Sequence, residues 1–581
     1  MATMTFGKLE IDPTKNPAVL DTATWDPKSA WEMLNAVEPA YWQSVQDALT
    51  AQTSLPRHDR CTLYPGSHAR YQGSDFLLAG LQDGQQIFIE IGQRKAPTEL
   101  GEALGAKSLS NGQQIAAYKT DAAVIDRFCR IIKPEKGPKA LKATPRLGIG
   151  VRMSAAAWPG IWQAMHKQQF AANAIQNSLR ELNMLEDLLA GKPAHSNYLF
   201  SFGTIDEGHT GSTFEGLWVA GVLSALRSDT TPLYGADADH IMVKRGPEGM
   251  SRAKRVIDAG RYYTFFTLDV SDILNYAAIK ETSAATAEAY VEDIIQDVTA
   301  RTDLLAYHSQ PHRIGGQDYN PDAAMLGRLV GKYWTALEAA QELYGYIKSF
   351  KQDIPFDLEL SIDENPPEVK TCESLTQDVE LMFLLLEIQR RQLPITHIAP
   401  NFGVEKGVDY RCPEGLEELE PRVRRQYHMA SEYGLMLDCH SGDDLKSPTR
   451  QVFGRATDGN IHFKVSPSLQ VVFGETLNDL FPEHFQFWWD DTLAYARREA
   501  EAGASVAAEC IQEYQNSPNP VPSARTALFE HFNFATVGKR DANGQFCFRE
   551  KFYDLPAEFY QEYTRRIERL LTEVAHDVFN R

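Results

Sequence analysis

The chain has 581 residues, of which 43% are hydrophobic and 23% are charged, as in an ordinary globular protein that can bury a large core. Its formal net charge of −20 and isoelectric point near 5.3 argue against a nucleic-acid or anionic-membrane surface, which needs clustered Lys and Arg. The N-terminus has no apolar signal core, and no stretch approaches the length of a membrane span.

Seven cysteines are scattered along the chain without a Cys-x-x-Cys pair. This odd, dispersed set is typical of reduced thiols and not of a disulfide framework or a zinc knuckle. We therefore expect free cysteines in a cytoplasmic protein with no nucleic-acid or membrane partner. The sequence does not specify the oligomeric state and allows a homo-oligomer.

Residues 1–140 are predicted to form a separate α+β region. Trp25–Leu49 has a helical pattern, and Asp75–Gly92 is typical of a hairpin, with two apolar runs around the turn signal Asp83-Gly84. Lys133–Lys142 is a polar connector rich in Pro, Gly and Lys, and it indicates the domain boundary. No chemical constellation stands out here, so we expect a lid or packing module.

From residue 145 the chain alternates short β-rich runs with helical windows, which predicts a mainly parallel sheet. The predicted strands are Leu147–Met153, Phe170–Ile175, Tyr198–Phe202, Pro232–Ala236, Tyr262–Leu268, Phe356–Ile362, Ile395–Ala399, Leu435–Cys439 and Ile461–Val465. The clearest helical windows are Ala284–Leu305, Met325–Phe350, Leu375–Gln392 and Leu416–Tyr433. This series fits an α/β fold with a TIM-barrel-like (β/α)8 catalytic domain over residues 145–475. Residues 476–581 are expected to form a mostly helical extension packed on the barrel.

Polar residues follow several of these strands, at the ends that converge on the catalytic face of a barrel. They are Gln176-Asn177-Ser178, Asp269-Val270-Ser271-Asp272, Asp363-Glu364, Asn401 with Glu405-Lys406-Gly407, and His440-Ser441-Gly442-Asp443-Asp444. The stretch LYGADADH (233–240) also carries two carboxylates directly into a histidine. His240 can offer a neutral nitrogen to a divalent metal, and Asp239 can accept a proton. A single Asp-His pair is more often a surface hydrogen bond, but several polar ends that converge favour a site.

Glu359 lies in the alternating strand FDLELSI, where Asp357, Glu359 and Ser361 share a face. On an outward face these side chains would be solvated. Inside a barrel Glu359 would be a buried carboxylate with a raised pKa, suited to proton transfer. His440 follows an apolar run, and we favour a metal ligand there over a structural histidine.

Three other features have simpler interpretations. His397 lies within its strand and is expected to be packed. The aromatic run 485–489 (FQFWW) is expected to be core and not a binding platform. His209, in the turn EGHTGST (207–213), fits either an anion-binding turn or an ordinary loop.

The motifs GADADH (235–240), TLDVSD (267–272), ELSIDE (359–364), EKGVDY (405–410) and CHSGDD (439–444) resemble those of the tagaturonate/fructuronate epimerase family, over roughly residues 145 to 580. The resemblance implies a metal-dependent isomerase of hexuronate catabolism that acts on a sugar acid. It implies Asp239 as the proton acceptor and Glu359 as the proton donor. It also implies His240 and His440 as metal ligands, with Glu405 as the third.

Substrate-binding residues follow from both arguments. Ser178 and Thr267 match family positions expected to line the sugar pocket, and the polar strand ends add Gln176, Asp269, Lys406 and Asp443. The family's turn after the metal histidine usually reads Ser-Gly-Ser-Asp-Lys, whereas here it is Ser-Gly-Asp-Asp-Leu-Lys (441–446). The lysine that could pair with a substrate carboxylate is therefore displaced. This departure bears on the substrate more than on the reaction.

Fructuronate and tagaturonate differ at C4, whereas the carbonyl is at C2, so the C4 hydrogen is not acidic. Inversion then needs oxidation at C4 by a nicotinamide, or retro-aldol cleavage between C3 and C4 with rebonding. The sequence has no glycine-rich phosphate loop after the first strand, which favours the second route. A divalent metal (Mn, Zn, Co or Ni) would stabilise the enediolate. The alternatives are a metal-dependent aldolase or lyase, an epimerase of a related neutral ketohexose, and a non-catalytic sugar-binding protein.

Overall fold

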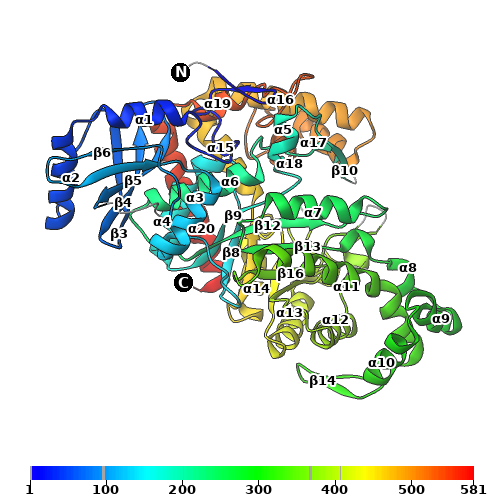
Figure 1. Ribbon diagram of the computed structural model, residues 1–581. Coiled ribbons are helices and arrows are strands. Elements are labelled where there is room, and N and C mark those ends of the chain that lie inside the picture. Colours follow the sequence, from blue (N-terminus) through cyan, green and yellow to red (C-terminus); the bar gives the residue numbers. More distant parts are fainter. Residues whose placement is uncertain (1–2, 94–98, 200–201, 366–368, 406, 581) are drawn as a thin grey trace.

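The centre of the protein is a closed barrel of eight parallel strands, seen in a computed structural model that describes residues 3–93, 99–199, 202–365, 369–405 and 407–580 (Figure 1). The strands follow one another around the barrel in chain order. They are β8 (Arg146–Gly150), β9 (Ala171–Ser178), β12 (Tyr234–Met242), β13 (Phe265–Asp269), β16 (Asp357–Ser361), β17 (His397–Ala399), β18 (Met436–Cys439) and β19 (Ile461–Val465). The predicted (β/α)8 barrel is confirmed.

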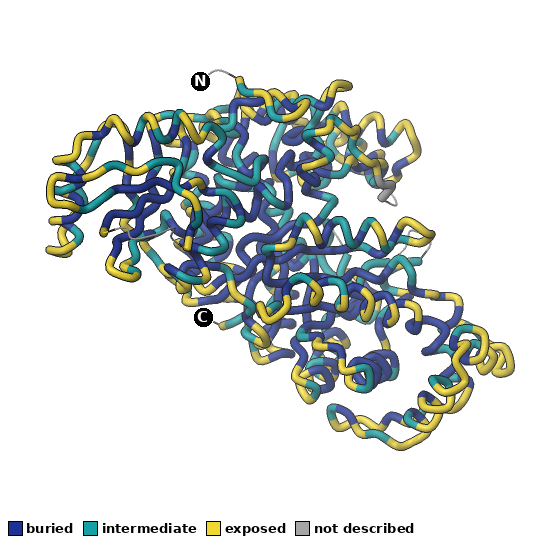
Figure 2. Tube along the Cα trace, viewed as in Figure 1, coloured by how far each residue is buried: buried dark blue, intermediate teal, exposed yellow. Residues whose placement is uncertain are grey.

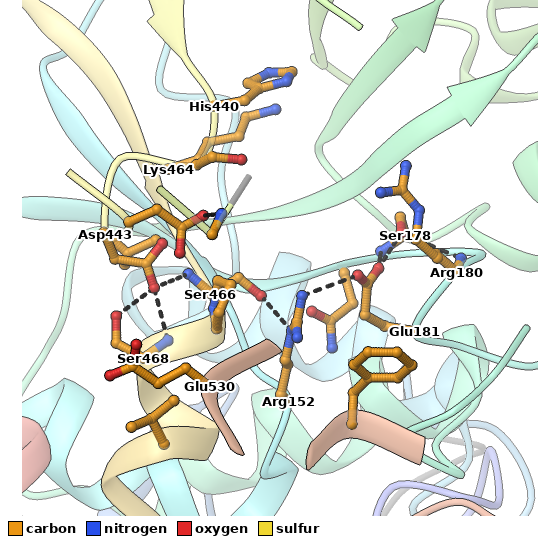
Figure 3. A pocket seen from close by; sticks show the side chains of 18 of the residues that line it. Arg152, Ser178, Arg180, Glu181, His440, Asp443, Lys464, Ser466, Ser468 and Glu530 are labelled. Atoms are coloured by element: carbon orange, nitrogen blue, oxygen red, sulfur yellow. Dashed lines mark hydrogen bonds and ion pairs between the residues drawn. The ribbon is translucent and has the colours of Figure 1, made fainter. Parts of the chain in front are cut away.

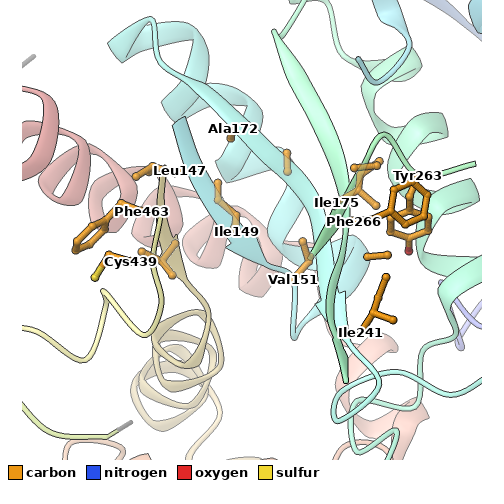
Figure 4. Close-up of a cluster of buried hydrophobic side chains, with 14 of the residues drawn as sticks. Leu147, Ile149, Val151, Ala172, Ile175, Ile241, Tyr263, Phe266, Cys439 and Phe463 are labelled. Atoms are coloured by element: carbon orange, nitrogen blue, oxygen red, sulfur yellow. The ribbon is translucent and has the colours of Figure 1, made fainter. Parts of the chain in front are cut away.

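Each barrel strand is followed by a helix that, except after β19, leads to the next barrel strand. These helices are α4 (Ser154–Gln168), α6 (Phe214–Arg227), α7 (Gly249–Ala259), α11 (Ala323–Lys351), α12 (Asp378–Arg390), α13 (Gly415–Glu432), α14 (Ser447–Ala456) and α15 (Pro467–Leu480). Apolar side chains on the outer strand faces, such as Leu147, Ile149, Ile175 and Phe463, are buried in one continuous core with the helices (Figure 4). Because strand residues alternate between faces, the barrel interior receives the other set.

Two excursions interrupt the barrel series. The first holds α5 (Leu185–Leu189) and a hairpin of β10 (Ser196–Leu199) and β11 (Gly203–Asp206). The second holds η3 (Ser271–Ile273), α8 (Tyr276–Ile279), α9 (Ala284–Ile294), α10 (Val298–His308), β14 (His312–Ile314) and β15 (Gln317–Tyr319), and forms the lobe at the lower right of Figure 1.

Two predictions need correction in these excursions. The predicted strand Tyr198–Phe202 is not a barrel strand, because β10 pairs antiparallel with β11; residues 200–201 lie outside the described residues. The predicted helix Ala284–Leu305 is divided into α9 and α10. The division falls where Asp297 caps α10, since its carboxylate accepts hydrogen bonds from the backbone N–H groups of Thr299 and Ala300.

The N-terminal region contains a five-stranded antiparallel sheet with helical segments against both faces. The sheet order is β3 (Cys61–Tyr71), β4 (Ser74–Leu81), β5 (Gln86–Gly92), β7 (Gln114–Tyr118) and β6 (Gly105–Ser108). The predicted hairpin is therefore β4–β5, and Gly84 at its turn has a φ of +89° that favours glycine. The predicted helix Trp25–Leu49 is two helices, α1 (Pro27–Asn35) and α2 (Pro39–Ala51), because Pro39 begins the second.

The helices α1 and α2 and one face of this sheet form a separate small core. The opposite face continues into the main core, where Phe88 stacks on Phe128 at 4.2 Å between ring centroids. The remaining elements before the barrel are β1 (Met4–Phe6), β2 (Leu9–Ile11), α3 (Ala122–Arg127), η1 (Phe128–Ile132) and η2 (Pro134–Lys136).

Helices dominate the chain after α15. They are α16 (Pro482–Glu501), α17 (Ser505–Asn516), α18 (Ala527–Phe532), η5 (Asn533–Ala535), α19 (Arg549–Tyr553) and α20 (Ala557–Phe579). The helix α20 packs against α4, α14 and α15 on the outside of the barrel. Phe485, Trp488 and Trp489 are buried and contact Phe529 of α18, so the packing interpretation of FQFWW is confirmed.

The cysteine prediction is wrong for one pair. Cys372 and Cys412 form a disulfide, while Cys61, Cys129, Cys439, Cys510 and Cys547 are free. The two bonded residues are 40 positions apart, but they lie in the loops after β16 and β17, which are neighbouring barrel strands. Sequence spacing alone does not reveal such a neighbourhood. Within the described ranges, no helix is both long enough and apolar enough to cross a bilayer.

The side chains inside the barrel are largely polar and buried. Figure 2 shows the centre of the molecule as buried. At the amino ends of the strands Arg146 donates to Asp357 at 3.1 Å, and both are fully buried. Further toward the carboxyl ends of the strands, position 148 must be a glycine. A Cβ there would lie 2.7 Å from atoms of both His462 and Lys464. The absence of a side chain on β8 therefore leaves room for the polar side chains of β19.

Candidate active site

A bulge in β12 places Asp239 and His240 together. The register of β12 against β13 shifts between Ala238 and Ile241, and His240 has a left-handed φ of +45°. Adjacent residues of a regular strand point to opposite faces, but a bulge redirects one of them. From the sequence we expected the pair at the end of a strand. The strand in fact continues to Met242, and the bulge changes the direction of the chain within it. A non-glycine residue at positive φ in a buried strand is typical of a functional site.

The bulge opens into a cavity of about 410 Å³ at the carboxyl ends of the barrel strands. Its wall includes the predicted residues Gln176, Ser178, Asp239, His240, His440 and Asp443, together with Arg152, Arg180, Glu181, His209, Lys464 and residues of the C-terminal helical region (Figure 3). The polar ends of β9, β12 and β18 thus converge on one cavity, whereas Asp269, Asp363 and Glu364, after β13 and β16, do not line it.

Asp239, His240 and His440 form a group that could hold a metal ion, since their ligand atoms all lie within 4.8 Å of one another. The two imidazole rings meet edge to face, with centroids 4.6 Å apart. Nδ1 of His240 lies 3.0 Å from the Asp269 carboxylate, which fixes the ring, and Nε2 lies 3.8 Å from Glu364 on the side where a metal could bind. Nδ1 of His440 lies 3.0 Å from Asp363.

Lys464 is the central residue of the site, and the sequence analysis missed it. Its Nζ donates to Oδ1 of Asp239 and to Oε2 of Glu359, both at 2.8 Å, and to Thr267 Oγ1 at 3.1 Å. Asp237 lies 3.6 Å away. The signal was present in IHFKV (461–465), where His462 and Lys464 alternate with apolar residues just as Glu359 does in its own strand.

The electrostatics correct one prediction. Burial alone would raise the pKa of Glu359, but Lys464 and His440 outweigh it and hold this pKa well below its usual range. Burial would likewise raise the pKa of Asp239, yet Lys464, His240 and His440 lower it. The raised carboxyl pKa values belong instead to Asp237, at about 8, and to Asp438, because burial there exceeds the attraction of Lys464. Asp239 and Glu359 are therefore ionised at neutral pH.

Three further predicted residues, Thr267, Asp269 and Asp443, have different surroundings in the structure. Thr267 accepts from Lys464 and donates to Glu359 at 3.1 Å, so it lies within the buried network. Asp269 orients His240. Asp443 accepts from the backbone N–H groups of Ser466 and Ser468, at 2.9 and 2.8 Å, and so braces the start of α15 beside the cavity.

Glu405 is not brought to the histidines. Its carboxylate pairs with Arg411 in the loop after β17, and it does not line the cavity within the described residues. Long loops can direct a side chain away from the strand end that precedes it, and spacing alone cannot detect this. Lys406 lies outside the described residues. His397 is fully buried against Phe265 and His462, so the prediction that it is packed is confirmed.

Two arginines were also missed by the sequence analysis. Arg152 donates to Ser466 Oγ at 3.0 Å and lies 3.5 Å from Glu181. Arg180 lies 3.5 Å from Glu364. Figure 3 shows both arginines in the pocket, set apart from His440. The cavity therefore has one part with histidines and carboxylates and another with guanidinium groups.

A closed parallel barrel with a polar cavity at its carboxyl face is the architecture of a barrel enzyme. A family model described as tagaturonate epimerase (UxaE) matches residues 206–575, which is more than half of the chain. The chain belongs to this family and is an enzyme of the isomerase class, as the resemblance of its motifs predicted.

Solved structures agree on the fold. The fructuronate-tagaturonate epimerase UxaE from Cohnella laeviribosi, in its native form, matches with a TM-score of 0.63 and 20% identity, covering 93% of this chain and 99% of that chain. A form of that protein complexed with one glycerol matches with a TM-score of 0.64 at the same identity and coverage. A search of curated proteins finds no significant match.

Replacing Lys464 with Met should strongly destabilise the protein at neutral pH. The variant leaves Asp239 and Glu359 buried without their cation, which typically costs about 3–5 kcal/mol. Both carboxylates have depressed pKa values in the wild type. Without Lys464 burial raises these pKa values, so protonation relieves the defect as pH falls. The deficit in the urea midpoint should be largest at pH 7 and smaller at pH 5.

Lys254→Met is the matched control, because Lys254 is a partly exposed lysine paired with Glu342. Its midpoint should change by less than about 1 kcal/mol in free-energy terms. A Lys464→Met protein as stable as the control at pH 7 would contradict the central role given to this ammonium group.

Proposed function

We propose that this enzyme interconverts D-tagaturonate and D-fructuronate by inversion at C4 of the sugar acid. The observation that carries the proposal is the cavity itself, where Asp239, His240, His440 and Lys464 meet in a chain of the tagaturonate epimerase family. The Cohnella relative is described as a fructuronate-tagaturonate epimerase and has been seen with glycerol. A small polyhydroxylated substrate is consistent with a cavity of about 410 Å³.

The residues present fit a divalent metal ion, and we propose His240 and His440 as ligands with Asp239 as the third in place of Glu405. Two imidazoles and a carboxylate suit Mn, Zn, Co or Ni. Asp269 contacts Nδ1 of His240 and is the carboxylate partner that a metal-binding histidine usually has. When bound, the ion would act as a Lewis acid on the C2 carbonyl of the sugar.

The substrate carboxylate is proposed to bind at Arg152 and Arg180. Arginine forks match carboxylates bidentately, and these two guanidinium groups line the same cavity as the histidines. Their present partners, Glu181 and Glu364, lie at 3.5 Å, longer than a strong charge-assisted hydrogen bond. Lys446, at the displaced position of the Ser-Gly-Asp-Asp turn, is exposed at the cavity wall. The arginines can thus supply the charge that the family's lysine would provide.

Asp239 is proposed to bind the metal through one carboxylate oxygen and to accept the C4 hydroxyl proton on the other as the C3–C4 bond breaks. It returns the proton when the bond forms again on the other face of the aldehyde. Its depressed pKa keeps it ionised, although it also makes the carboxylate a weak base until its cationic partners move or are replaced. Glu359, the proton donor implied by the resemblance, is ionised and fully buried and therefore has no proton to give. We propose instead that it holds Lys464 and His440, the two groups through which it reaches the cavity. Lys464 bonds to both carboxylates and holds them apart in fixed positions.

Other aspects of the proposal rest on the sequence. We propose the division into residues 1–140, 145–475 and 476–581, since the antiparallel sheet, the barrel and the later helices fall within these ranges. A cytoplasmic location and homo-oligomerisation stay predictions. The disulfide Cys372–Cys412 removes part of the support that the cysteine pattern gave to the location.

Incubation of D-fructuronate with the metal-loaded enzyme in D2O should yield D-tagaturonate with ordinary hydrogen at C4. In retro-aldol cleavage the C4 hydrogen stays on the aldehyde carbon throughout, so solvent does not exchange there. Proton NMR of the product measures both the epimer and the label. Deuterium at C4 would contradict the retro-aldol route, and free aldehyde fragments as the main product would identify a lyase.

His440→Ala should lose the bound metal, because the variant retains only two of the three proposed ligands. Metal content by elemental analysis after dialysis against the divalent ion should fall at least tenfold. The buried His397→Gln variant is the matched control and should keep its metal, since His397 is packed among Phe265 and His462. Equal metal content in wild type and His440→Ala would remove His440 from the ligand set.

Arg152→Gln should raise KM for D-fructuronate more than KM for the neutral ketose D-fructose. The loss of a charge-assisted contact of about 1.5–3 kcal/mol corresponds to a KM increase of roughly ten- to a hundredfold for the uronate alone. Steady-state kinetics on both sugars measures this ratio. A preference for the neutral ketose already in the wild type would favour the related neutral-ketohexose epimerase.

A further inference from the structure

A second cavity, of about 740 Å³, lies at the opposite end of the barrel from the active site. It is lined by α3 and η1, by the connector 137–140, by the segment that precedes β13, and by the carboxyl end of α11 with the residues that lead into β16. It therefore joins the N-terminal region to the amino ends of the barrel strands. It shares no lining residue with the first cavity.

The charges that line this cavity are nearly all positive. The cationic side chains are Arg127, Arg130, Lys139, Arg261 and Lys351, and the one acidic side chain is Asp126. Such a concentration stands out in a chain with a formal net charge of −20. Clustered cations raise the local concentration of anions.

Lys351 adds a second, independent observation. It is only 4% exposed, and its Nζ makes one hydrogen bond among the described residues, at 2.5 Å to the backbone carbonyl of Tyr263. No described carboxylate lies within ion-pair distance of it. By contrast, the buried Lys332 pairs with Glu380 at 2.5 Å, and the buried Lys136 donates to three carbonyls.

The surroundings of Lys351 favour an added negative charge. Burial lowers its pKa to about 8; Asp126 opposes this fall, whereas Arg130 and Arg261 strengthen it. Nε of Arg127, in the same lining, is buried and has no hydrogen-bond partner in the described structure. An anion near these groups would satisfy both donors and offset the repulsion among the cations.

We propose that this cavity binds a small multivalent anion with Lys351 at its base and Arg127 and Arg130 at its wall. Guanidinium forks and an ammonium group recognise phosphate esters and polycarboxylates by the same chemistry. Partly buried Tyr262 and Phe350 can cover an attached carbon skeleton. Because the cavity spans the N-terminal region and the barrel, bound anion would hold the two together and raise thermal stability.

Isothermal titration calorimetry of the full chain at low ionic strength tests the site, with inorganic pyrophosphate and citrate as probes. At least one probe should bind saturably, and the wild type should show a rise in Tm with that probe. Binding by pyrophosphate alone assigns the phosphate class, and binding by citrate alone assigns the polycarboxylate class. Lys351→Met and Arg130→Gln should each weaken the affinity at least tenfold. Arg130 is partly exposed, so its variant tests the site without a risk to folding.

Two controls separate this site from the rest of the molecule. Arg525→Gln and Lys254→Met each remove a cation that lies outside both cavities. Both should bind the probe as the wild type does. No binding, or equal binding by Lys351→Met and Arg130→Gln, would overturn the proposal and leave Lys351 as a helix-terminal cation of α11. Loss of binding in Arg152→Gln with unchanged binding in Lys351→Met would place the probe in the active-site cavity and would also overturn the proposal. The readout is binding and not turnover, so it is independent of the proposed epimerase activity.

Discussion

The ammonium group of Lys464 is the interaction on which the rest of the site depends. It lies inside the barrel at 2.8 Å from both Asp239 and Glu359, with Asp237 at 3.6 Å. Carboxylates at these distances repel one another strongly in a buried environment. A fixed cation between them allows these two to stay ionised, while burial raises the pKa of Asp237 to about 8 and also raises the pKa of Asp438, which lies 3.9 Å from the ammonium group. The balance of charges inside the barrel thus determines which carboxyl groups are ionised and which are protonated.

The backbone provides the matching constraint. Gly148 on β8 leaves the interior space that His462 and Lys464 occupy, and a Cβ there would lie 2.5 Å from Gln176. The bulge at His240 turns two adjacent residues toward one cavity, at the cost of a left-handed φ in a buried strand. The absence of a side chain at Gly148 therefore provides space for the polar side chains, and the strained backbone at His240 directs two adjacent side chains into the cavity. The apolar outer faces of the same strands hold the barrel in place.

The two cavities lie at opposite ends of the barrel, and the charges of their linings differ. The carboxyl face gathers histidines and carboxylates with arginines in a separate part, as suits a metal and an anionic sugar. The amino face gathers cations around Lys351. Both lie where the barrel meets other parts of the chain: the C-terminal helical region at the first, and the N-terminal region at the second. The additions to the barrel thus complete cavities at both of its ends.

The sequence by itself determined the barrel and much of the first cavity. Strands of short apolar runs alternate with helical windows, and polar residues at strand ends must converge once the strands are parallel, so Gln176, Asp239, His240 and His440 were within reach of prediction. Only the tertiary structure decided the roles of Lys464, Arg152 and Arg180, because their partners are distant in sequence. It also decided that Glu405 lies beside Arg411, that Cys372 and Cys412 are paired, and that the pKa of Glu359 falls. The physical reason is common to all of these: a pKa or a partner depends on distances across the barrel. Those distances exist only after strands far apart in the chain have closed on one another.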